Sequence, residues 1–409
     1  MDVQTKCSNS TSGPMCYEEA SGSLAVIIIP SLLALSTVLV VALIFCSLYR
    51  YRQKRQRNSA PAHYPNASIS PVRVQEALRP WEIPGECVLV GLKYWQTGRY
   101  GPICNGLLKR DRTSTAVVVK SLRGCNNPEA KEFVDWVLFH ATVCKHENLV
   151  RMLSCRTKRL PMYLVLEAYS PGNLLHFLWT LRNRDSDTGE SSQHFSERSV
   201  FLVAKQVAAG LDYLMSEHRL VHGDVAARNI LIGPGLSARV SGLGVAFAGR
   251  QMDSTTRQRV AEVPLKWQAP ERIMKQLTID RSDVWSFGIL LYEMITLGSP
   301  PYPELEPQSV LQQLQKSYRM KRPDNCGGPL YDLMKYCWMW SFKERPTFSA
   351  IIKLLESYQH LAANTALSIP EAIDIFEYKK KAGLSTHEQH QPRENNVKEN
   401  EVFKYSVDL

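Results

Sequence analysis

Residues 221–232 read VHGDVAARNILI, and residues 239–249 read RVSGLGVAFAG. The first stretch places His222, Asp224 and Asn229 in the spacing H-x-D-x-x-x-x-N. This spacing brings a carboxylate that can align a hydroxyl group and a carboxamide that can bind a metal ion into one loop. In the second stretch, Gly242 lies among small and apolar residues, and no Asp or Glu occurs from Arg239 to Gly249. The first stretch therefore has the residue types of a catalytic loop, whereas the second supplies no carboxylate for a metal ion.

The composition is that of a globular protein. The 409 residues are 44% apolar and 22% charged, enough for one large or two ordinary domains. A net charge of +10 suits nucleic-acid binding. Five of the positive residues, however, lie together in Arg50–Arg57, and no basic patch with interleaved aromatic residues is present. We therefore expect no nucleic-acid partner.

Residues 24–48, LAVIIIPSLLALSTVLVVALIFCSL, contain no charged residue. About 20 apolar residues are enough for a helix to cross a bilayer, so this segment predicts one transmembrane helix. The basic run follows the segment, and acidic residues precede it. By the positive-inside rule, residues 1–23 form a short extracellular segment and the remainder is cytoplasmic. The predicted localisation is therefore single-pass in a membrane, with the plasma membrane as the expected one.

Several features flank this segment. Asn9 begins a glycosylation sequon, which is either modified or an unused triplet close to the membrane. Cys7 and Cys16 are predicted on the oxidising side, so they or the membrane helix offer a route to a homo-oligomer. The basic run Arg50–Arg57 either binds anionic membrane lipids or only fixes the topology.

Beyond the basic run, the pattern divides the chain into a linker, one large domain and a tail. Residues 49–85 are basic and then rich in Pro, Ser and Asn, which indicates a juxtamembrane region and linker. Residues 86–362 begin with β-like runs and continue with helical patterning, which indicates a sheet lobe, a helical lobe and a cleft between them. Residues 363–409 turn polar and charged, as in a flexible cytoplasmic tail.

Two signals in the sheet lobe are weak alone and stronger together. Gly98 and Gly101 permit a tight turn that approaches phosphate oxygens, and Lys120 ends an apolar strand about twenty residues later. Taken alone, the glycines would be explained by an ordinary hairpin turn, and the lysine by exposure to solvent.

With the motifs that follow, these residues resemble the protein kinase superfamily, in its receptor tyrosine-kinase branch, over residues 86–362. Asp283 matches the aspartate of a buried helix, Ala269-Pro270-Glu271 matches the A-P-E element, and Arg345 matches the partner of that glutamate. The resemblance implies an α+β, two-lobed protein-kinase-like fold with a small β-rich N-lobe and a large helical C-lobe, here preceded by one transmembrane helix. The short ectodomain, HGDVAARN and GLG are similar to those of a family of membrane kinase-like proteins linked to growth signalling.

The resemblance also implies a site. Asp224 would be the catalytic residue, although an aspartate that caps its own loop is the structural alternative. Asn229 would be the secondary metal ligand, and Gly242 occupies the primary ligand position, which argues against ordinary Mg²⁺ binding. ATP is the expected cofactor. The residues expected to bind it are Lys120, Gly98, Gly101, Ile103, Glu167, Tyr169 and Leu231.

Other family positions are also altered. Counting along the helix expected after Lys120 places Trp136 or Val137 where the lysine's glutamate would stand, with Asp135 as the nearest acid. Gln96 replaces the first loop glycine and Gly223 replaces an arginine. The segment from Gly242 to Trp267 contains no tyrosine, so control by loop tyrosine phosphorylation is not expected.

Two functions remain open from the sequence. The first is a catalytically impaired membrane scaffold that recruits cytosolic signalling proteins in growth signalling. The second is an active but atypical tyrosine-protein kinase that transfers the ATP γ-phosphate to protein tyrosine. Tyr378 and Tyr405 in the tail are either docking sites once phosphorylated or incidental.

Overall fold

The computed structural model describes residue 32 and residues 34–45, 71–85, 87–124, 127–182, 195–251, 263–274, 281–370 and 373–382. The chain divides into two compact units, residues 1–68 and residues 69–409. In the first unit, residue 32 and residues 34–45 are helical.

The prediction of a transmembrane helix over residues 24–48 is wrong. Among the residues that the structure describes, no helix is both long and apolar enough to span a bilayer. Residues 34–45 rise only about 18 Å as a helix, whereas a bilayer core is about 30 Å thick. The single-pass localisation that depended on this helix is corrected with it. Asn9, Cys7, Cys16 and Arg50–Arg57 lie outside the described residues.

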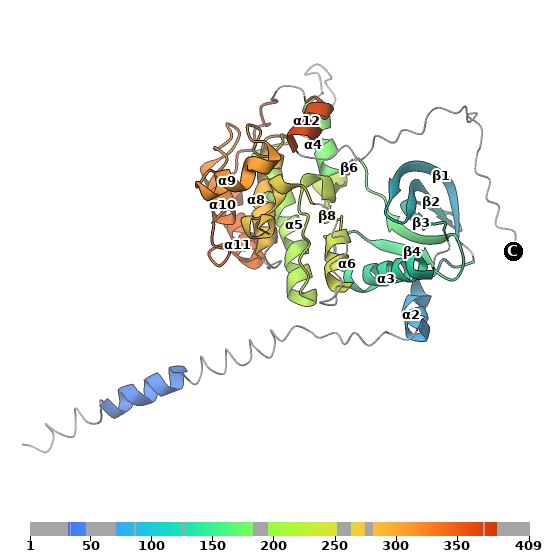
Figure 1. Ribbon diagram of the computed structural model, residues 1–409, viewed down its shortest axis with the longest axis horizontal. Coiled ribbons are helices and arrows are strands. Elements are labelled where there is room, and N and C mark those ends of the chain that lie inside the picture. The colour runs from blue at the N-terminus through green and yellow to red at the C-terminus, as the bar shows by residue number, and fades with distance from the viewer. Residues whose placement is uncertain are drawn as a thin grey trace, which may run out of the picture. The chain divides into compact units, whose positions relative to one another are not determined.

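The second unit begins with a sheet lobe (Figure 1). Its five strands are antiparallel in the order β1-β2-β3-β5-β4. They are β1 (Cys87–Gly98), β2 (Gly101–Arg110), β3 (Thr113–Leu122), β4 (Met152–Arg156) and β5 (Met162–Glu167). Val117 and Val119 alternate along β3 and pack with Val165 on one face of the sheet. Helix α3 (Asn127–Val143) connects β3 to β4 and packs against α2 (Pro71–Leu78).

Helices dominate the rest of the unit. They are α4 (Leu174–Arg182), α5 (Glu197–His218), α6 (Gly244–Gln251), α7 (Pro270–Ile273), α8 (Ser282–Ile295), α9 (Val310–Gln315), α10 (Gly328–Cys337), α11 (Phe348–Tyr358) and α12 (Ile375–Ala382). A small sheet adds β6 (Gly172–Asn173), β7 (Ile230–Ile232) and β8 (Ala238–Val240). Helix α8 lies in the core, where Trp285, Phe287 and Leu290 are fully buried. The two-lobed part of the fold prediction is therefore confirmed.

The tail differs from the sequence expectation in one segment. Residues 375–382 form helix α12, which bears two buried residues, Tyr378 and Ala382. Asp374 begins this helix, since its side chain accepts the N–H of Phe376 at 2.8 Å.

A buried ion pair links the A-P-E element to the end of the helical lobe. Arg345 donates to Glu271 through both terminal nitrogens, at 2.7 and 2.9 Å. Burial raises the pKa of Glu271, but the hydrogen bonds and charge of Arg345 lower it by more, so it stays below its ordinary value. The sequence-based pairing of these two residues is therefore present in the structure.

Removing one partner of this ion pair tests how much the pair contributes to the stability of the fold. Arg345→Leu should lower the free energy of unfolding by about 3–5 kcal/mol, because an uncompensated carboxylate would remain buried. Lys335→Ala, which breaks the exposed pair with Asp332, is the control and should cost under about 1 kcal/mol. Urea denaturation followed by fluorescence measures both, and equal losses would contradict the prediction.

Candidate functional site

Helix α8 holds the loop that contains His222, Asp224 and Asn229. The buried carboxylate of Asp283 accepts the backbone N–H of His222 at 2.6 Å and that of Gly223 at 2.8 Å. Near the other end of α8, Glu293 accepts the N–H of Ala227 at 2.9 Å. The loop is therefore fixed at both ends by carboxylates of one helix.

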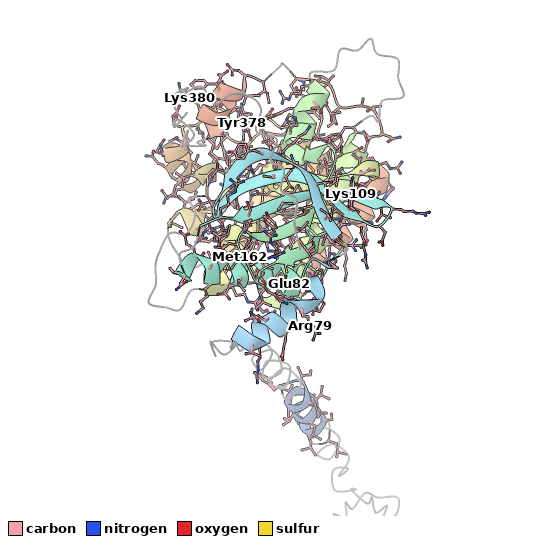
Figure 2. All side chains as sticks on the ribbon, turned by 90° about the vertical axis from the view of Figure 1, so that its right-hand side faces the viewer. Arg79, Glu82, Lys109, Met162, Tyr378 and Lys380 are labelled. Carbon is pink, nitrogen blue, oxygen red and sulfur yellow. The ribbon has the colours of Figure 1, made fainter. Side chains whose placement is uncertain are left out.

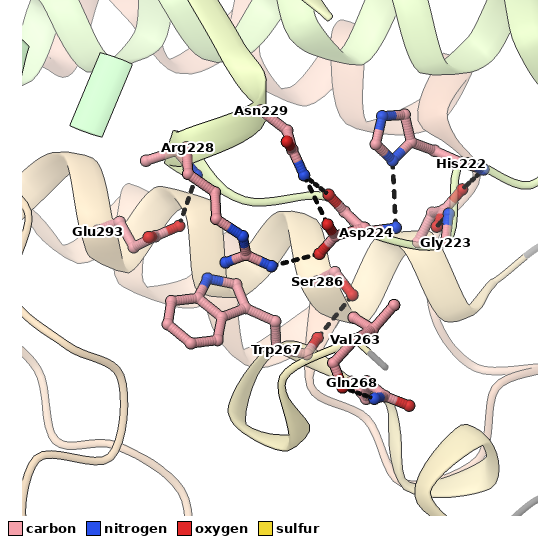
Figure 3. A network of polar contacts seen from close by, with 12 residues as sticks. His222, Gly223, Asp224, Arg228, Asn229, Val263, Trp267, Gln268, Ser286 and Glu293 are labelled. Atoms are coloured by element: carbon pink, nitrogen blue, oxygen red, sulfur yellow. Dashed lines mark hydrogen bonds and ion pairs between the residues drawn. The ribbon is translucent and has the colours of Figure 1, made fainter. Parts of the chain in front are cut away.

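Within the loop, three side chains form a compact network (Figure 3). Arg228 donates to Oδ1 of Asp224. The side-chain nitrogen of Asn229 donates to Oδ2 of Asp224 at 2.7 Å and to its carbonyl oxygen at 2.8 Å. The predicted catalytic residue and the predicted metal ligand are thus in direct contact. Their predicted roles stay predictions.

Two glycines beside this network occupy positions that no other residue fits. Gly242 has φ +75°, and a Cβ there would lie 2.5 Å from Cγ and Oδ1 of Asn229. Gly223 has φ +79°, and a Cβ there would lie 2.5 Å from Cγ1 of Val245. Both the backbone conformation and the space therefore require glycine. The family's aspartate and arginine would need different backbone positions.

A cavity of about 270 Å³ lies between the glycine turn, β3, α3 and the Gly242 segment. Four of the seven predicted nucleotide-binding residues line it, namely Gly98, Gly101, Ile103 and Lys120. Gln96 is exposed and lies outside the lining, so it does not crowd the cavity.

The other three predicted nucleotide-binding residues form a separate group at the end of β5. Glu167 lies 3.8 Å from Arg239, whose guanidinium is over the ring of Tyr169. Leu231 pairs with Arg239 across β7 and β8. Glu167, Tyr169 and Leu231 are all absent from the cavity lining. The predicted nucleotide-binding residues therefore form two groups, one at the glycine turn and β3 and the other at the end of β5.

Lys120 contacts an aromatic ring where an active kinase would offer a carboxylate. Its Nζ lies 5.7 Å from the ring centroid of Trp136, in cation–π range. Within the described structure, no ion pair joins Lys120 to Asp135, the acid that the sequence places nearest. Burial lowers the pKa of Lys120, and burial followed by the Lys120 charge lowers the pKa of His140 to about 3. The surroundings of the lysine are thus aromatic and neutral.

Phe247 and Tyr100, which the sequence reasoning missed, complete the cavity wall. Phe247, on α6, contacts Trp136 and Phe139 of α3 with ring centroids 4.8 and 5.5 Å apart. Tyr100 donates to Glu132 of α3 at 3.1 Å. Spacing did point to Trp136, but a helix at Phe247 had no sequence signal. The aromatic contacts tie α6 and the glycine turn to α3.

This arrangement agrees with comparisons to known proteins. A family model described as protein tyrosine and serine/threonine kinase matches residues 92–355. The chain belongs to this protein kinase family. It is 35% identical to tyrosine-protein kinase STYK1 of Mus musculus, over 88% of this chain and 90% of that protein. The Homo sapiens protein of that name is also 35% identical, over 88% of this chain and 91% of that protein. Tyrosine-protein kinase Abl of Drosophila melanogaster is 36% identical over 68% of this chain and 16% of that protein.

The resemblance to the tyrosine-kinase branch is thereby confirmed. Kinase domains of this family bind ATP, as expected, and Mg²⁺ is their usual metal. The prediction against Mg²⁺ thus finds no support in the family. Among the described residues, no three His, Cys, Asp or Glu side chains are grouped so that they could hold a metal ion.

The requirement for glycine at position 242 can be measured. Gly242→Ala should lower the free energy of unfolding by about 2 kcal/mol, because alanine is strained at this φ and its Cβ meets Asn229. Gly244→Ala is the control, since a Cβ there meets nothing within 4 Å. A drop in melting temperature of roughly 4–8 °C for the first variant alone is expected. Equal melting temperatures would contradict the packing argument.

The carboxyl of Glu293 should make stability depend on pH. Burial raises its pKa from 4.5 to about 7, although the N–H of Ala227 and the charge of Arg228 lower it. Between these values the folded state holds a proton that the unfolded state releases, so Glu293 lowers stability as pH rises through this window. In urea titrations, Glu293→Gln should lose that slope and the exposed Glu356→Gln should keep it. If the free energy of unfolding changed with pH in the same way in wild type and in Glu293→Gln, the pKa of Glu293 would not be raised in the folded state.

Proposed function

We propose that this chain is an ATP-binding tyrosine-kinase-like signalling protein whose phosphate transfer is weak and whose main role is to recruit other signalling proteins. One observation supports this most directly. At the position of the metal-binding aspartate, Gly242 lacks a carboxylate and is packed against Asn229 with no space for a side chain. Without that ligand, the metal is held by fewer protein groups.

The loss of turnover rate that follows from the missing metal ligand can be calculated approximately. A missing metal clamp removes several kcal/mol of transition-state stabilisation. At about 1.4 kcal/mol per factor of ten, roughly 3–5 kcal/mol corresponds to a loss of two to four powers of ten. Kinases ordinarily turn over about 1–100 times per second. Turnover should therefore be slow.

Lys120 supports the same proposal. In an active kinase a carboxylate orients this lysine toward the nucleotide phosphates. Here the Trp136 ring is its neighbour on α3, and a ring attracts a cation with less directional preference than a carboxylate. Lys120 can still contact a phosphate, because it lines the cavity beside Gly98 and Gly101. Nucleotide binding is therefore expected to survive better than phosphate transfer.

The second candidate is an active but atypical tyrosine-protein kinase. The contacts of Asp224 with Arg228 and Asn229 support it, since they fix the orientation of the carboxylate that we expect to align a substrate hydroxyl. In that case Asp224 would accept or align the tyrosine proton, and Asn229 would contribute to Mg²⁺ binding.

Phosphate transfer and ATP binding, measured on the full-length protein, separate the two. ATP should raise the melting temperature by similar amounts with Mg²⁺ and with EDTA, because one metal ligand is missing. Lys120→Met should abolish that rise. Transfer to a tyrosine peptide should fall at least about a hundredfold below ordinary kinase rates.

Two aspartate variants supply the control for activity. Any residual transfer should disappear in Asp224→Ala and persist in Asp332→Ala, which alters an exposed surface residue. Turnover near one per second that depends on Asp224 would overturn the scaffold proposal in favour of the enzyme.

A further inference from the structure

Helix α12 packs against the helical lobe through one face. Tyr378 and Ala382 lie one turn apart and are 2% and 0% exposed. On the opposite side Phe376 is 67% exposed. Figure 2 shows Tyr378 on the side of α12 toward the domain and Lys380 on the outer side. Burial of one face at i, i+4 spacing is the mark of a docked amphipathic helix.

The surface under Tyr378 is held rigidly by the lobe. Its ring meets Trp179 of α4 edge to face, with centroids 4.9 Å apart. The indole of Trp179 donates to the carbonyl of Gly298 at 3.0 Å. Arg182, one turn further along α4, donates to the carbonyl of Leu297 at 2.7 Å. The aromatic contact is therefore made to a preorganised surface.

This surface adjoins the catalytic loop. Burial raises the pKa of Tyr378 well above its ordinary value; the charge of Glu293 raises it further and that of Arg228 lowers it. The phenol thus lies within electrostatic reach of the arginine that pairs with Asp224. The guanidinium of Arg228 also lies over the ring of Trp267, 4.7 Å from the ring centroid.

The phenol of Tyr378 is buried without a hydrogen-bond partner in the described structure. Nη1 of Arg228 is likewise buried without a hydrogen-bond partner, and the indole of Trp267 lies close enough to the carboxyl of Glu293 to lower its pKa. A buried hydroxyl without a partner weakens the docking that its ring supports. Apolar contacts therefore hold α12 on the helical lobe, while buried polar groups without partners oppose its docking. As a result, the docking of α12 is easily reversed.

We propose that Tyr378 is a tyrosine-phosphorylation site and that its phosphorylation releases α12 from the face formed by α4, the catalytic loop and the Leu265–Trp267 turn. A second protein tyrosine kinase would modify the helix while it is undocked. The γ-phosphoryl group of ATP is transferred to the phenol oxygen, the phenolic proton passes to the base of that kinase, and ADP leaves.

The release follows from charge and volume. The phosphoryl group adds nearly two negative charges beside Glu293, in a space where the hydroxyl already has no partner. Redocking would bury the phosphoryl group beside the carboxyl of Glu293, while the nearby guanidinium of Arg228 is already paired with Asp224, so the modified helix stays free. The freed face includes the ring of Trp179 on α4, a helix that packs against the Ala227–Asn229 turn of the catalytic loop, whether or not this chain transfers phosphate itself.

The modification step is tested on the full-length protein with a purified active tyrosine kinase, ATP and Mg²⁺. Mass spectrometry follows phosphate on Tyr378 and on the 65% exposed Tyr94. Trp179→Ala, which removes the aromatic contact, should speed modification of Tyr378 by at least about tenfold and leave Tyr94 unchanged. No phosphate on Tyr378, or equal rates in both proteins, would overturn the proposal.

Hydrogen exchange over residues 375–382 tests the release step. Phosphorylation of Tyr378, or Tyr378→Glu, should speed exchange there by at least about tenfold. The matched control Phe376→Glu, on the exposed side of the same helix, should exchange like wild type, and Tyr378→Phe should exchange no faster. Unchanged protection in α8 shows that each variant is folded. Equal exchange for Tyr378→Glu and Phe376→Glu would contradict release.

Discussion

The structure depends most on two buried carboxylates of α8, Asp283 and Glu293. They accept backbone N–H groups at opposite ends of the catalytic loop. A buried N–H without a partner costs about 1–3 kcal/mol, so the helix and the loop each require the other. Because α8 is packed on all sides, the loop geometry is inherited from the core of the helical lobe. This is why the loop keeps a kinase-like arrangement although residues around it have changed.

The altered positions fit one another. With Gly242, Asn229 can close against the backbone, and its amide is then used by Asp224. With Trp136 in place of an acid, α3 can receive Phe247 of α6, and Lys120 contacts the ring. At both positions, a packing contact within the chain stands where the kinase family has a carboxylate.

In the described part of the chain, the phenol of Tyr378 and Nη1 of Arg228 lie in this region, buried without hydrogen-bond partners. Burial of Glu293, Arg228, Trp267 and Tyr378 close together is unfavourable unless something compensates it. Apolar packing of α12 on Trp179 is the compensation visible in the structure. A helix held in this way is sensitive to any added charge. The catalytic loop and the tail are thereby connected through shared electrostatics and not through the ATP side of the domain.

Four features could be predicted from the amino-acid sequence: the two-lobed fold, the His222–Asn229 loop, the anchor at Asp283 and the Glu271–Arg345 pair. These motifs are local, or pair by fixed spacing, so one chain is enough to read them. The apolar composition of residues 24–48 led to a wrong prediction, since no helix among the residues that the structure describes is long and apolar enough to span a membrane. Three features required the folded structure: Trp136 faces Lys120, Gly242 has no space for a side chain, and Tyr378 is buried. Each depends on which residues far apart in the chain lie within a few ångströms, and steric and electrostatic terms act over that distance and not over sequence spacing.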